Sequence, residues 1–503
     1  MDKASKVSII RRKRRRPRAA APRWIGWSFR VALACLLVFA IICAGISLKI
    51  RAANSSQNID KLPSAEGLSH AKRLLVIAPH PDDEALACSG LIQRVKRNGG
   101  QVRVVYLTCG DGFRVAMERT LKEIKSKPTD FIRFGEFRQN ETAHANSELN
   151  IKKSEVVFLG YPDRGLVPMW KTNWTTPYKS YYTKVMKCPY RDAYCYGAPY
   201  TGQGLVKALS DVIGLYQPTS VLVTHPLDDH PDHYAAYAFT TAALEQRRLP
   251  HPTTSQNIDL QTYLVHRGGV WPTPQRDAGR YPMAPPAAFS AIDGTSWEVL
   301  KLSASEVAIK DRAINAYKSQ TAIMGSFLRS FGRKNELFGK VSLPHIPLVA
   351  NNAISADGNG SDWASIRPQL CDPVGDTVSR TLREGADIKT LWLARDARNL
   401  YVRIDTAKNI PGGLGVRVML RSIDGSVSHA LPLSFTAPKT MIPTGSEFGY
   451  KGSIFEAKVP LGAMSADEKA VFDTAGVWAG ASTYYLGFNV DKTGWRPMTL
   501  ARR

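Results

Sequence analysis

Short apolar runs alternate with stretches of helical spacing from about Lys72 onward. The runs are LLVIA (74–78), VRVVYLT (102–108), VVFLG (156–160) and SVLVT (220–224). Helical patterns separate them, among them 84–96 and 204–216, and another helix, 232–246, follows the last run. Short apolar strands that alternate with helices are typical of a parallel sheet covered by helices on both faces. The pattern therefore predicts an α/β fold for this part of the chain.

The pattern changes after about residue 344. Short alternating or β-branched runs, separated by Gly, Asp and Pro, replace the helical stretches: IKTLWLAR, NLYVRIDT, GVRVMLRS, SIFEAKVP and TYYLGFNV. Such spacing indicates an antiparallel β-sandwich over residues 344–503.

The amino-terminal region has the pattern of a membrane anchor. Residues 31–48 carry no charge, and as a helix they would span about 27 Å, close to the hydrocarbon thickness of a bilayer. RRKRRRPR (11–18) precedes the run, and this bias keeps the amino end cytoplasmic. We expect a cytoplasmic tail (1–23), a single transmembrane anchor (24–50), a linker (51–70) and an extracytoplasmic remainder, periplasmic or extracellular. The alternatives are a cleaved signal peptide, whose apolar region is usually shorter, and nuclear import, which leaves the apolar run unexplained.

The net charge of the chain narrows the possible classes of binding partner only in part. The 503 residues carry a net charge of +24, and eleven of the first thirty residues are basic against one acidic. The rest of the chain is also basic, which suits an anionic glycan, a membrane or a nucleic acid. No recognition motif accompanies the basic run, so a nucleic acid is not the expected partner.

Two clusters of histidine and aspartate follow predicted strands. APHPDDEALA (78–87) comes directly after the first strand and THPLDDHPDH (224–233) after the fourth, and three of the ten histidines fall within 225–233. Ligands in parallel sheets gather beyond the carboxyl ends of the strands, so both clusters face one rim. An open zinc site needs about three nitrogen or oxygen ligands and a free position for water. A helix cap or a surface histidine would explain either cluster alone, but explains the two together poorly.

These residues resemble the PIG-L/LmbE-like family of metal-dependent N-deacetylases. The resemblance rests on APHPDDE (78–84), LTCGDG (107–112), Arg138 with Glu141, LGYPDRGL (159–166) and HPDH (230–233). It implies a Rossmann-like fold over residues 71–343, one zinc ion, and hydrolysis of the acetamide of an amino sugar.

The resemblance also implies roles for single residues. His80, Asp83 and His233 would be the metal ligands, and Asp82 the general base. His230, protonated, would stabilise the oxyanion and protonate the leaving amine. Two further residues would stand behind the ligands: Asp232, orienting one of the histidines, and His225.

Two more positions match residues that contact sugar hydroxyls in the family. They are Arg138 and Asp163. A turn role is the alternative for Asp163, and an ion pair with Glu141 on one helix is the alternative for Arg138.

The segment 167–200 is rich in Trp and Tyr. Its aromatic side chains could line a substrate groove or lid, or form a small core under a long loop, pinned by a disulfide between Cys188 and Cys195. The tail resembles a family-9 carbohydrate-binding module or a DOMON-like sandwich. Trp392 and Tyr401 carry that resemblance, as sugar contacts or as core residues, and a purely supporting tail is the alternative.

The sequence thus predicts a membrane-anchored, extracytoplasmic zinc N-deacetylase. Its expected substrates are N-acetylglucosamine-type residues of a surface polysaccharide or glycolipid. The alternative from another class is a catalytically inactive, glycan-binding surface protein.

Overall fold

The computed structural model describes the chain from residue 59 onward with several gaps. The described residues are 37, 59–248, 258–267, 271–274, 277–286, 294–372, 374, 384–424, 427–435, 441–474, 476–486 and 488–500. Ser56–Arg503 forms one compact unit. Apart from Leu37, the predicted tail and anchor lie outside the described residues. Within the described ranges, no helix is both long and apolar enough to cross a bilayer.

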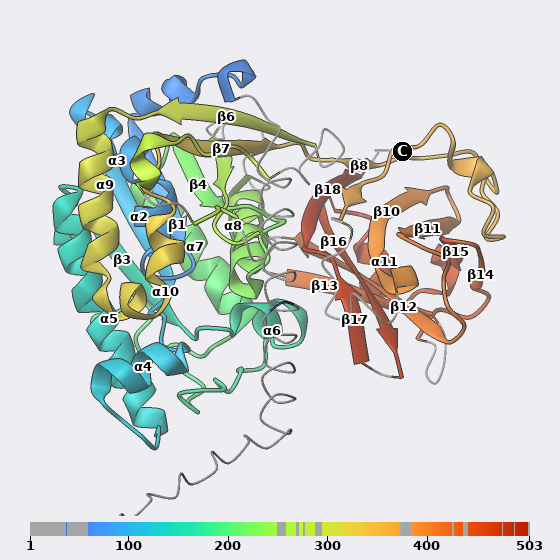
Figure 1. Ribbon diagram of the computed structural model, residues 1–503. Helices are drawn as coiled ribbons and strands as arrows, with labels where there is room; N and C mark the ends of the chain where they lie inside the picture. Colours follow the sequence, from blue (N-terminus) through green and yellow to red (C-terminus); the bar gives the residue numbers. More distant parts are fainter. Residues whose placement is uncertain are drawn as a thin grey trace, which may run out of the picture. The chain divides into compact units, whose positions relative to one another are not determined.

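A seven-stranded sheet in the order β3-β2-β1-β4-β5-β7-β6 forms the centre of the first half (Figure 1). Five strands are parallel: β1 (Arg73–Ala78), β2 (Gln101–Thr108), β3 (Val156–Tyr161), β4 (Ser220–Thr224) and β5 (Asp259–Tyr263). The antiparallel strands β6 (Thr295–Lys301) and β7 (Asn335–Val341) extend the sheet at one edge. The predicted parallel sheet is therefore confirmed, with this antiparallel edge added to it.

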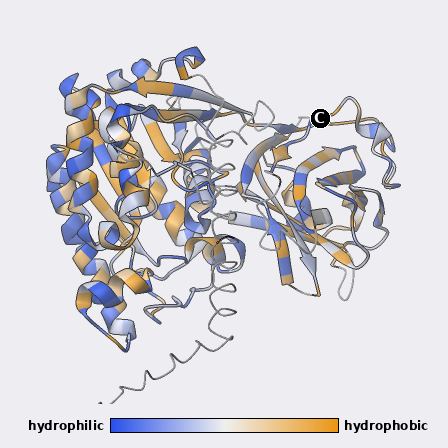
Figure 2. Ribbon diagram, viewed as in Figure 1, coloured by the Kyte–Doolittle hydropathy of each residue, from blue (hydrophilic) through white to orange (hydrophobic). Residues whose placement is uncertain are grey.

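Helices cover both faces of this sheet, as the strand pattern predicts. Alternate residues of β1 enter different cores: Leu74 and Val76 pack with helices α3, α5 and α9, whereas Leu75 and Ile77 pack with α6, α7 and α8. Figure 2 shows apolar residues along the central strands and polar ones on outer helix surfaces. The helices are α2 (Asp83–Ala87), α3 (Ser89–Arg97), α4 (Arg114–Leu121), α5 (Pro128–Glu148), α6 (Leu166–Lys171), α7 (Gly202–Tyr216), α8 (Pro231–Arg248), α9 (Ala304–Ala316) and α10 (Lys318–Arg329).

The sheet order reverses at β1. Strand β1 pairs with β2 on one side and β4 on the other, and the chain leaves them toward opposite edges. At such a switch point the loops after the two strands separate and leave a crevice for a ligand. Both histidine clusters lie at this point.

The second half contains two separate sheets, which are antiparallel as the sequence predicts except for the parallel pair β8 and β18. One has the order β14-β15-β11-β10-β9 and the other β13-β12-β16-β18-β8, with β17 on β16. Apolar side chains of both sheets share one core. The elements are β8 (His345–Ile346), β9 (Leu370–Cys371), β10 (Ile388–Arg395), β11 (Asn399–Thr406), β12 (Leu414–Asp424), β13 (Val427–Phe435), β14 (Glu447–Lys451), β15 (Ile454–Pro460), β16 (Gly476–Tyr485), β17 (Phe488–Lys492), β18 (Arg496–Leu500) and helix α11 (Ala466–Ala470).

Tyr401 and Trp392, the two residues behind the carbohydrate-module resemblance, differ in their surroundings. Tyr401 is fully buried and donates its hydroxyl to Asp396 at 2.7 Å, so it is a core residue. Trp392 is partly exposed, and the Arg403 guanidinium lies 4.7 Å from its ring centre.

The six-stranded sheet packs directly against the first half of the chain. Trp478 of β16 donates its indole N–H to Thr241 of α8 at 2.9 Å, and Trp495 lies in the same apolar cluster as α8. The backbone of Gly494 touches Pro226: a Cβ atom on Gly494 would lie only 2.1 Å from the Pro226 carbonyl oxygen. The sandwich thus contacts both α8 and the loop of the second histidine cluster.

The aromatic segment 167–200 is mainly a small core. Trp170, Trp174, Tyr190 and Tyr200 are buried, and their rings pack into the cluster shared with α6 to α8. Three tyrosines of the segment are exposed instead: Tyr181, Tyr194 and Tyr196.

The predicted disulfide between Cys188 and Cys195 is not formed in this structure. Both are buried thiols without a disulfide, as are Cys88 and Cys109. Main-chain hydrogen bonds between the two ends of this loop hold the segment instead: the Cys188 N–H donates to the Ala198 carbonyl and the Gly197 N–H to the Cys188 carbonyl, each at 3.0 Å. Hydrogen bonds and ring packing therefore stabilise this segment without a disulfide.

Removing the Trp495 indole should destabilise the protein strongly. The side chain is 2% exposed, so Trp495→Ala leaves a cavity at the junction and should lower the free energy of unfolding by about 3–5 kcal/mol. Tyr450→Ala, at a half-exposed position on β14, is the control and should cost less than about 1 kcal/mol. Denaturant titration measures both, and equal small effects would contradict a packed junction.

Candidate functional site

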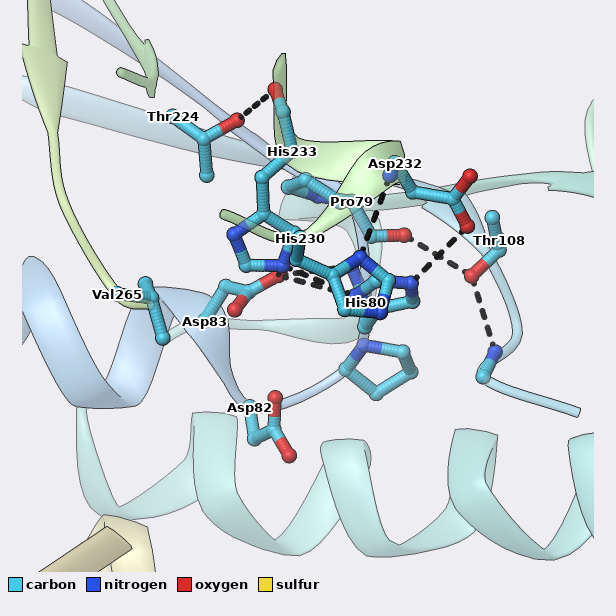
Figure 3. A network of polar contacts seen from close by, with 12 residues as sticks. Pro79, His80, Asp82, Asp83, Thr108, Thr224, His230, Asp232, His233 and Val265 are labelled. Atoms are coloured by element: carbon cyan, nitrogen blue, oxygen red, sulfur yellow. Dashed lines mark hydrogen bonds and ion pairs between the residues drawn. The ribbon is translucent and has the colours of Figure 1, made fainter. Parts of the chain in front are cut away.

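The two histidine clusters meet at the ends of β1 and β4. His80 Nδ1 and His233 Nε2 are 3.2 Å apart, although 153 residues separate them in the sequence. His80 belongs to the loop between β1 and α2, and His233 to the first turn of α8 (Figure 3). Parallel neighbouring strands bring these loops together, as the sequence predicts.

Asp83 completes a triangle of donor atoms. Its Oδ2 lies 3.7 Å from His80 Nδ1 and 3.5 Å from His233 Nε2. Ligand atoms at about 2.0–2.1 Å from a tetrahedral zinc ion are themselves about 3.3 Å apart, so the three edges fit a divalent ion of this kind. Two nitrogens and one carboxylate oxygen also make a donor set typical of catalytic zinc. The residues predicted as ligands are therefore brought together in a geometry that a metal fits.

Carboxylates face the outer nitrogens of both histidines. His80 Nε2 lies 3.3 Å from Asp232 Oδ2 and 3.4 Å from Asp163 Oδ1, and His233 Nδ1 lies 3.2 Å from Asp228 Oδ2. A carboxylate in this position accepts a hydrogen bond from the ring N–H, which leaves the inner nitrogen without a proton and free to bind a cation. The structure thus places Asp232 where it can orient His80. It also places Asp163, predicted to contact a sugar, against the same ring.

Asp228 was not singled out from the sequence, although it lies in the second cluster. Its Oδ2 accepts the backbone N–H groups of Val265 and His266, each at 3.0 Å. Burial opposes its ionisation, but the charge and hydrogen bond of His233 outweigh burial and hold the Asp228 pKa well below its usual range. Its role depends on the strand that follows α8, which explains why the local motif did not identify it.

His230 lies beside the triangle. A ring nitrogen of His230 is within 4.8 Å of those of His80 and His233. Its Nδ1 accepts the Asp232 N–H at 3.2 Å, so in the neutral ring the proton is on Nε2. Burial, followed by the charges of His80 and His233, lowers the pKa of His230 well below its usual range. These surroundings favour a neutral hydrogen-bond donor over the protonated acid that the sequence resemblance implies.

Asp82 is held in a strained backbone conformation. Its φ of 124° is one that residues other than glycine rarely adopt, and such strain is often found at functional sites. Burial raises the pKa of Asp82 to about 7, against the opposing charge of Arg138. The conformation turns this carboxylate toward α5, apart from the ligand triangle (Figure 3).

Arg138 fixes the Asp82 carboxylate. Its Nη2 donates to Asp82 Oδ2 at 3.1 Å and to the Pro81 carbonyl, and its Nη1 donates to the Gly110 carbonyl at 3.2 Å. Glu141 instead accepts the N–H and hydroxyl of Ser319, at 2.7 and 2.5 Å. The ion pair between Arg138 and Glu141, considered from their spacing, is therefore replaced by two separate contacts.

A pocket that is open to solvent leads to these groups. Its lining combines polar residues, among them His80, Asp82, Arg138 and Asp163, with apolar ones, namely Leu86, Phe113 and, from α10, Met324, Phe327 and Leu328. Arg138 and Asp163 therefore line the pocket while also making the contacts described above.

Two further histidines lie in positions that the sequence did not indicate. His266 lines the pocket and stacks on Phe327, with ring centres 5.4 Å apart, and it follows β5 as the clusters follow β1 and β4. That repeated strand-end position is the signal that could have identified it. His225 lies against β6 instead: its Nε2 is 3.0 Å from Thr295 Oγ1 and its ring stacks on Trp297. The predicted place of His225 behind the metal ligands is thus not the one it occupies.

Comparison with known families identifies this part of the chain. Residues 75–244 match the family model described as PIG-L, GlcNAc-PI de-N-acetylase. The match spans both histidine clusters, so the chain contains a PIG-L family domain at these residues.

Curated relatives are deacetylases. The chain is 27% identical over 204 residues to a 1D-myo-inositol 2-acetamido-2-deoxy-alpha-D-glucopyranoside deacetylase of Corynebacterium kroppenstedtii, covering 38% of this chain and 46% of that protein. It is 28% identical over 198 residues to the corresponding deacetylase 1 of Saccharopolyspora erythraea, covering 38% of this chain and 61% of the relative. The chain thus spans about half the length of the curated relatives it matches.

Solved structures include an N,N'-diacetylchitobiose deacetylase from Pyrococcus horikoshii. It is 17% identical, with a TM-score of 0.34, and the match covers 56% of this chain and 88% of that one. The conserved protein TT1542 from Thermus thermophilus is 23% identical, with a TM-score of 0.31, over 54% of this chain and 93% of that one.

Removing either histidine of the triangle should remove the metal. His80→Ala and His233→Ala each delete one of three donors, so the divalent metal retained after incubation with Zn²⁺, measured by elemental mass spectrometry, should fall to near background. His225→Ala is the control, because His225 lies outside the triangle. Full metal content in both triangle variants would contradict the assigned ligand set.

Asp228→Asn should weaken metal binding without removing a ligand. The amide that replaces the Asp228 carboxylate is neutral and attracts the His233 ring N–H less strongly. The affinity of the site for the metal should therefore fall about 10–100-fold. Competition with a chromogenic chelator measures this affinity. Asp229→Asn, the neighbouring change, is the comparison, and an equal loss in both variants would contradict a specific role for Asp228.

Proposed function

We propose that the protein is a metal-dependent N-deacetylase acting on N-acetylglucosamine-type residues of a surface polysaccharide or glycolipid. The observation that carries the proposal is the triangle of His80, Asp83 and His233 with Asp82 beside it at the same pocket. The PIG-L match over 75–244 and the deacetylase relatives support the reaction class.

His80, Asp83 and His233 would hold a divalent ion, for which the donor set favours Zn²⁺. When bound, such an ion supplies Lewis-acid polarisation of the amide carbonyl and of water. The outer carboxylates keep both imidazoles in the tautomer that binds it.

Asp82 acts as the general base. It takes a proton from the attacking water and returns it to the amine nitrogen as the C–N bond breaks, which yields acetate and the free amine. Arg138 holds the carboxylate in one orientation, and the strained backbone prevents it from joining its neighbour Asp83 in the ligand triangle. A base fixed in this way contributes about 10²–10⁴-fold to the rate.

His230 stabilises the oxyanion. Its Nδ1 accepts a backbone N–H, so the neutral ring keeps its proton on Nε2 and can donate it to the developing negative charge. A positioned donor of this kind is typically worth about 10²–10³-fold in rate. This role does not need the imidazolium form, which burial disfavours.

The extracytoplasmic, membrane-anchored location is part of the proposal. It is supported by the uncharged run at 31–48 and the basic run before it, which favour an amino end inside and a catalytic domain outside. A surface polysaccharide or glycolipid suits that location better than a soluble metabolite does.

An inactive glycan-binding protein is the second candidate. A domain that only binds does not require three donor atoms, oriented imidazoles and a strained carboxylate at one pocket. The complete set therefore favours hydrolysis.

Incubation with a panel of N-acetylated oligosaccharides and glycolipids tests the function. We expect acetate release that a chelator abolishes and added Zn²⁺ restores, followed by mass spectrometry of the products. Absence of chelator-sensitive release from every substrate of the panel would reject the proposed activity.

Asp82→Asn tests the assignment within the aspartate pair. The metal content should stay close to that of the native protein, while kcat falls by about 10²-fold or more, because a positioned base is lost. The matched change Asp83→Asn should lower both kcat and the metal content, because Asp83 is one of the three donors. Loss of metal in Asp82→Asn would show that the two roles are reversed.

A further inference from the structure

The six-stranded sheet carries a row of cations on one face. Arg417 of β12 faces Ser482 of β16, and Ser482 faces Lys492 of β17. Directly opposite residues of neighbouring strands project from the same face, so Arg417 and Lys492 share a face, two strand spacings or about 10 Å apart.

The same face packs against α6. Arg421 follows Arg417 by four residues on β12 and therefore projects from the same side. Its guanidinium lies 4.6 Å from the ring centre of Trp174 and donates to the Lys171 carbonyl at 3.4 Å. The main chain of Lys171, the last residue of α6, thus lies beside the row. We call Lys171, Arg417 and Lys492 the junction cations.

The junction cations have no carboxylate partner among the residues that the structure describes. Arg417 lies over the Tyr484 ring at 5.4 Å and Lys492 over the Tyr234 ring at 5.9 Å, and neither forms an ion pair there. Burial, then the charges of Lys492 and Arg417, lowers the pKa of Lys171 to about 8. Three cations are therefore gathered without an ion pair to a carboxylate in the described residues, and the one acidic group that feels the charge of Lys492 is the buried Asp491 beside it in β17.

An anion at this position would relieve that repulsion. Lysine binds phosphate as a point charge, and arginine binds phosphate or carboxylate in a planar, two-bond geometry. Arg417 and Lys492 are exposed and Lys171 is half-buried, so a group from solvent can reach all three.

The junction cations are close to the catalytic residues. Helix α6 starts at Leu166, whose N–H donates to Asp232 Oδ1 at 3.2 Å, and it ends at Lys171. Six helical residues span only about 8 Å. Arg164, just before the helix, is exposed and lines the pocket. The loop before α6 thus lies at the pocket and the end of α6 at the junction, so a substrate that spans both would follow this helix.

We propose that the junction cations bind an anionic group, a phosphate or a carboxylate, on the same glycan whose N-acetylated residue enters the pocket. This inference rests on the proposed function for its substrate, and it makes that substrate an anionic glycan. The sandwich then contributes to substrate binding through the face at the junction, rather than through the Trp392 region.

Binding tests the site without any turnover. Isothermal titration with inorganic pyrophosphate and with an oligogalacturonate distinguishes the phosphate from the carboxylate source. At least one probe should bind the native protein, and Lys171→Gln and Arg417→Gln should each weaken it about tenfold or more. Lys451→Gln, at an exposed lysine on β14 of the other sheet, should change nothing.

Three results would overturn the inference. Neither probe binds; both junction variants bind as the native protein does; or the three variants weaken binding equally, which would indicate a diffuse effect of net charge. Binding to vesicles containing phosphatidylglycerol that requires the junction cations, without binding of either soluble probe, would assign them to a lipid surface instead.

Kinetics then connects the site to the reaction. For an anionic N-acetylated oligosaccharide, Lys171→Gln should raise KM about tenfold and leave kcat unchanged, whereas a neutral oligosaccharide of equal length should show no change. A lowered kcat on both substrates would indicate a structural role and reject the inference. If no substrate is deacetylated, the proposed function fails, and the titrations still decide whether the anion site exists.

Discussion

The contact on which the rest of the site depends is the one between His80 and His233. Their inner nitrogens are 3.2 Å apart and share Asp83 as a neighbour, which places three electron-rich atoms around one small volume. Such an arrangement is unfavourable unless a cation or protons lie between the atoms. The fold maintains this arrangement because two carboxylates contact the opposite nitrogens of the rings. Asp232 lies at His80 Nε2, and Asp228 lies at His233 Nδ1. Those carboxylates are fixed in turn by backbone N–H groups of neighbouring loops.

Two adjacent aspartates have different surroundings at this site. Asp83 begins α2 and turns toward the histidines, whereas Asp82 has a positive φ and turns toward Arg138. Neighbouring residues with opposite orientations allow one carboxylate to bind a cation and the other to remain available for proton transfer. The buried Arg138 guanidinium holds Asp82 in this orientation. It also donates to a main-chain carbonyl in each of two loops.

The sequence was sufficient for the sheet and for the meeting of the two clusters. Apolar runs and strand-end motifs depend on local order, and parallel pairing of β1 with β4 then brings His80 to His233. It was not sufficient for contacts that depend on side-chain direction or on distant strands. Arg138 points to Asp82 rather than along its own helix to Glu141, and His225 points to β6. His266 required knowledge that β5 lies beside β4, and the free thiols at Cys188 and Cys195 required the turn geometry between them.

The contact of Gly494 with Pro226 has a consequence for how this architecture can be divided. A glycine there allows two main chains to touch, and the second main chain belongs to the loop that leads to His230 and His233. A shortened protein ending near residue 343 would leave one side of that loop, and the side of α8 that now receives Trp478, bare to water. A variant that lacks the sandwich must therefore cover this surface in another way. A fusion of the first half of the chain to a foreign domain requires the same replacement.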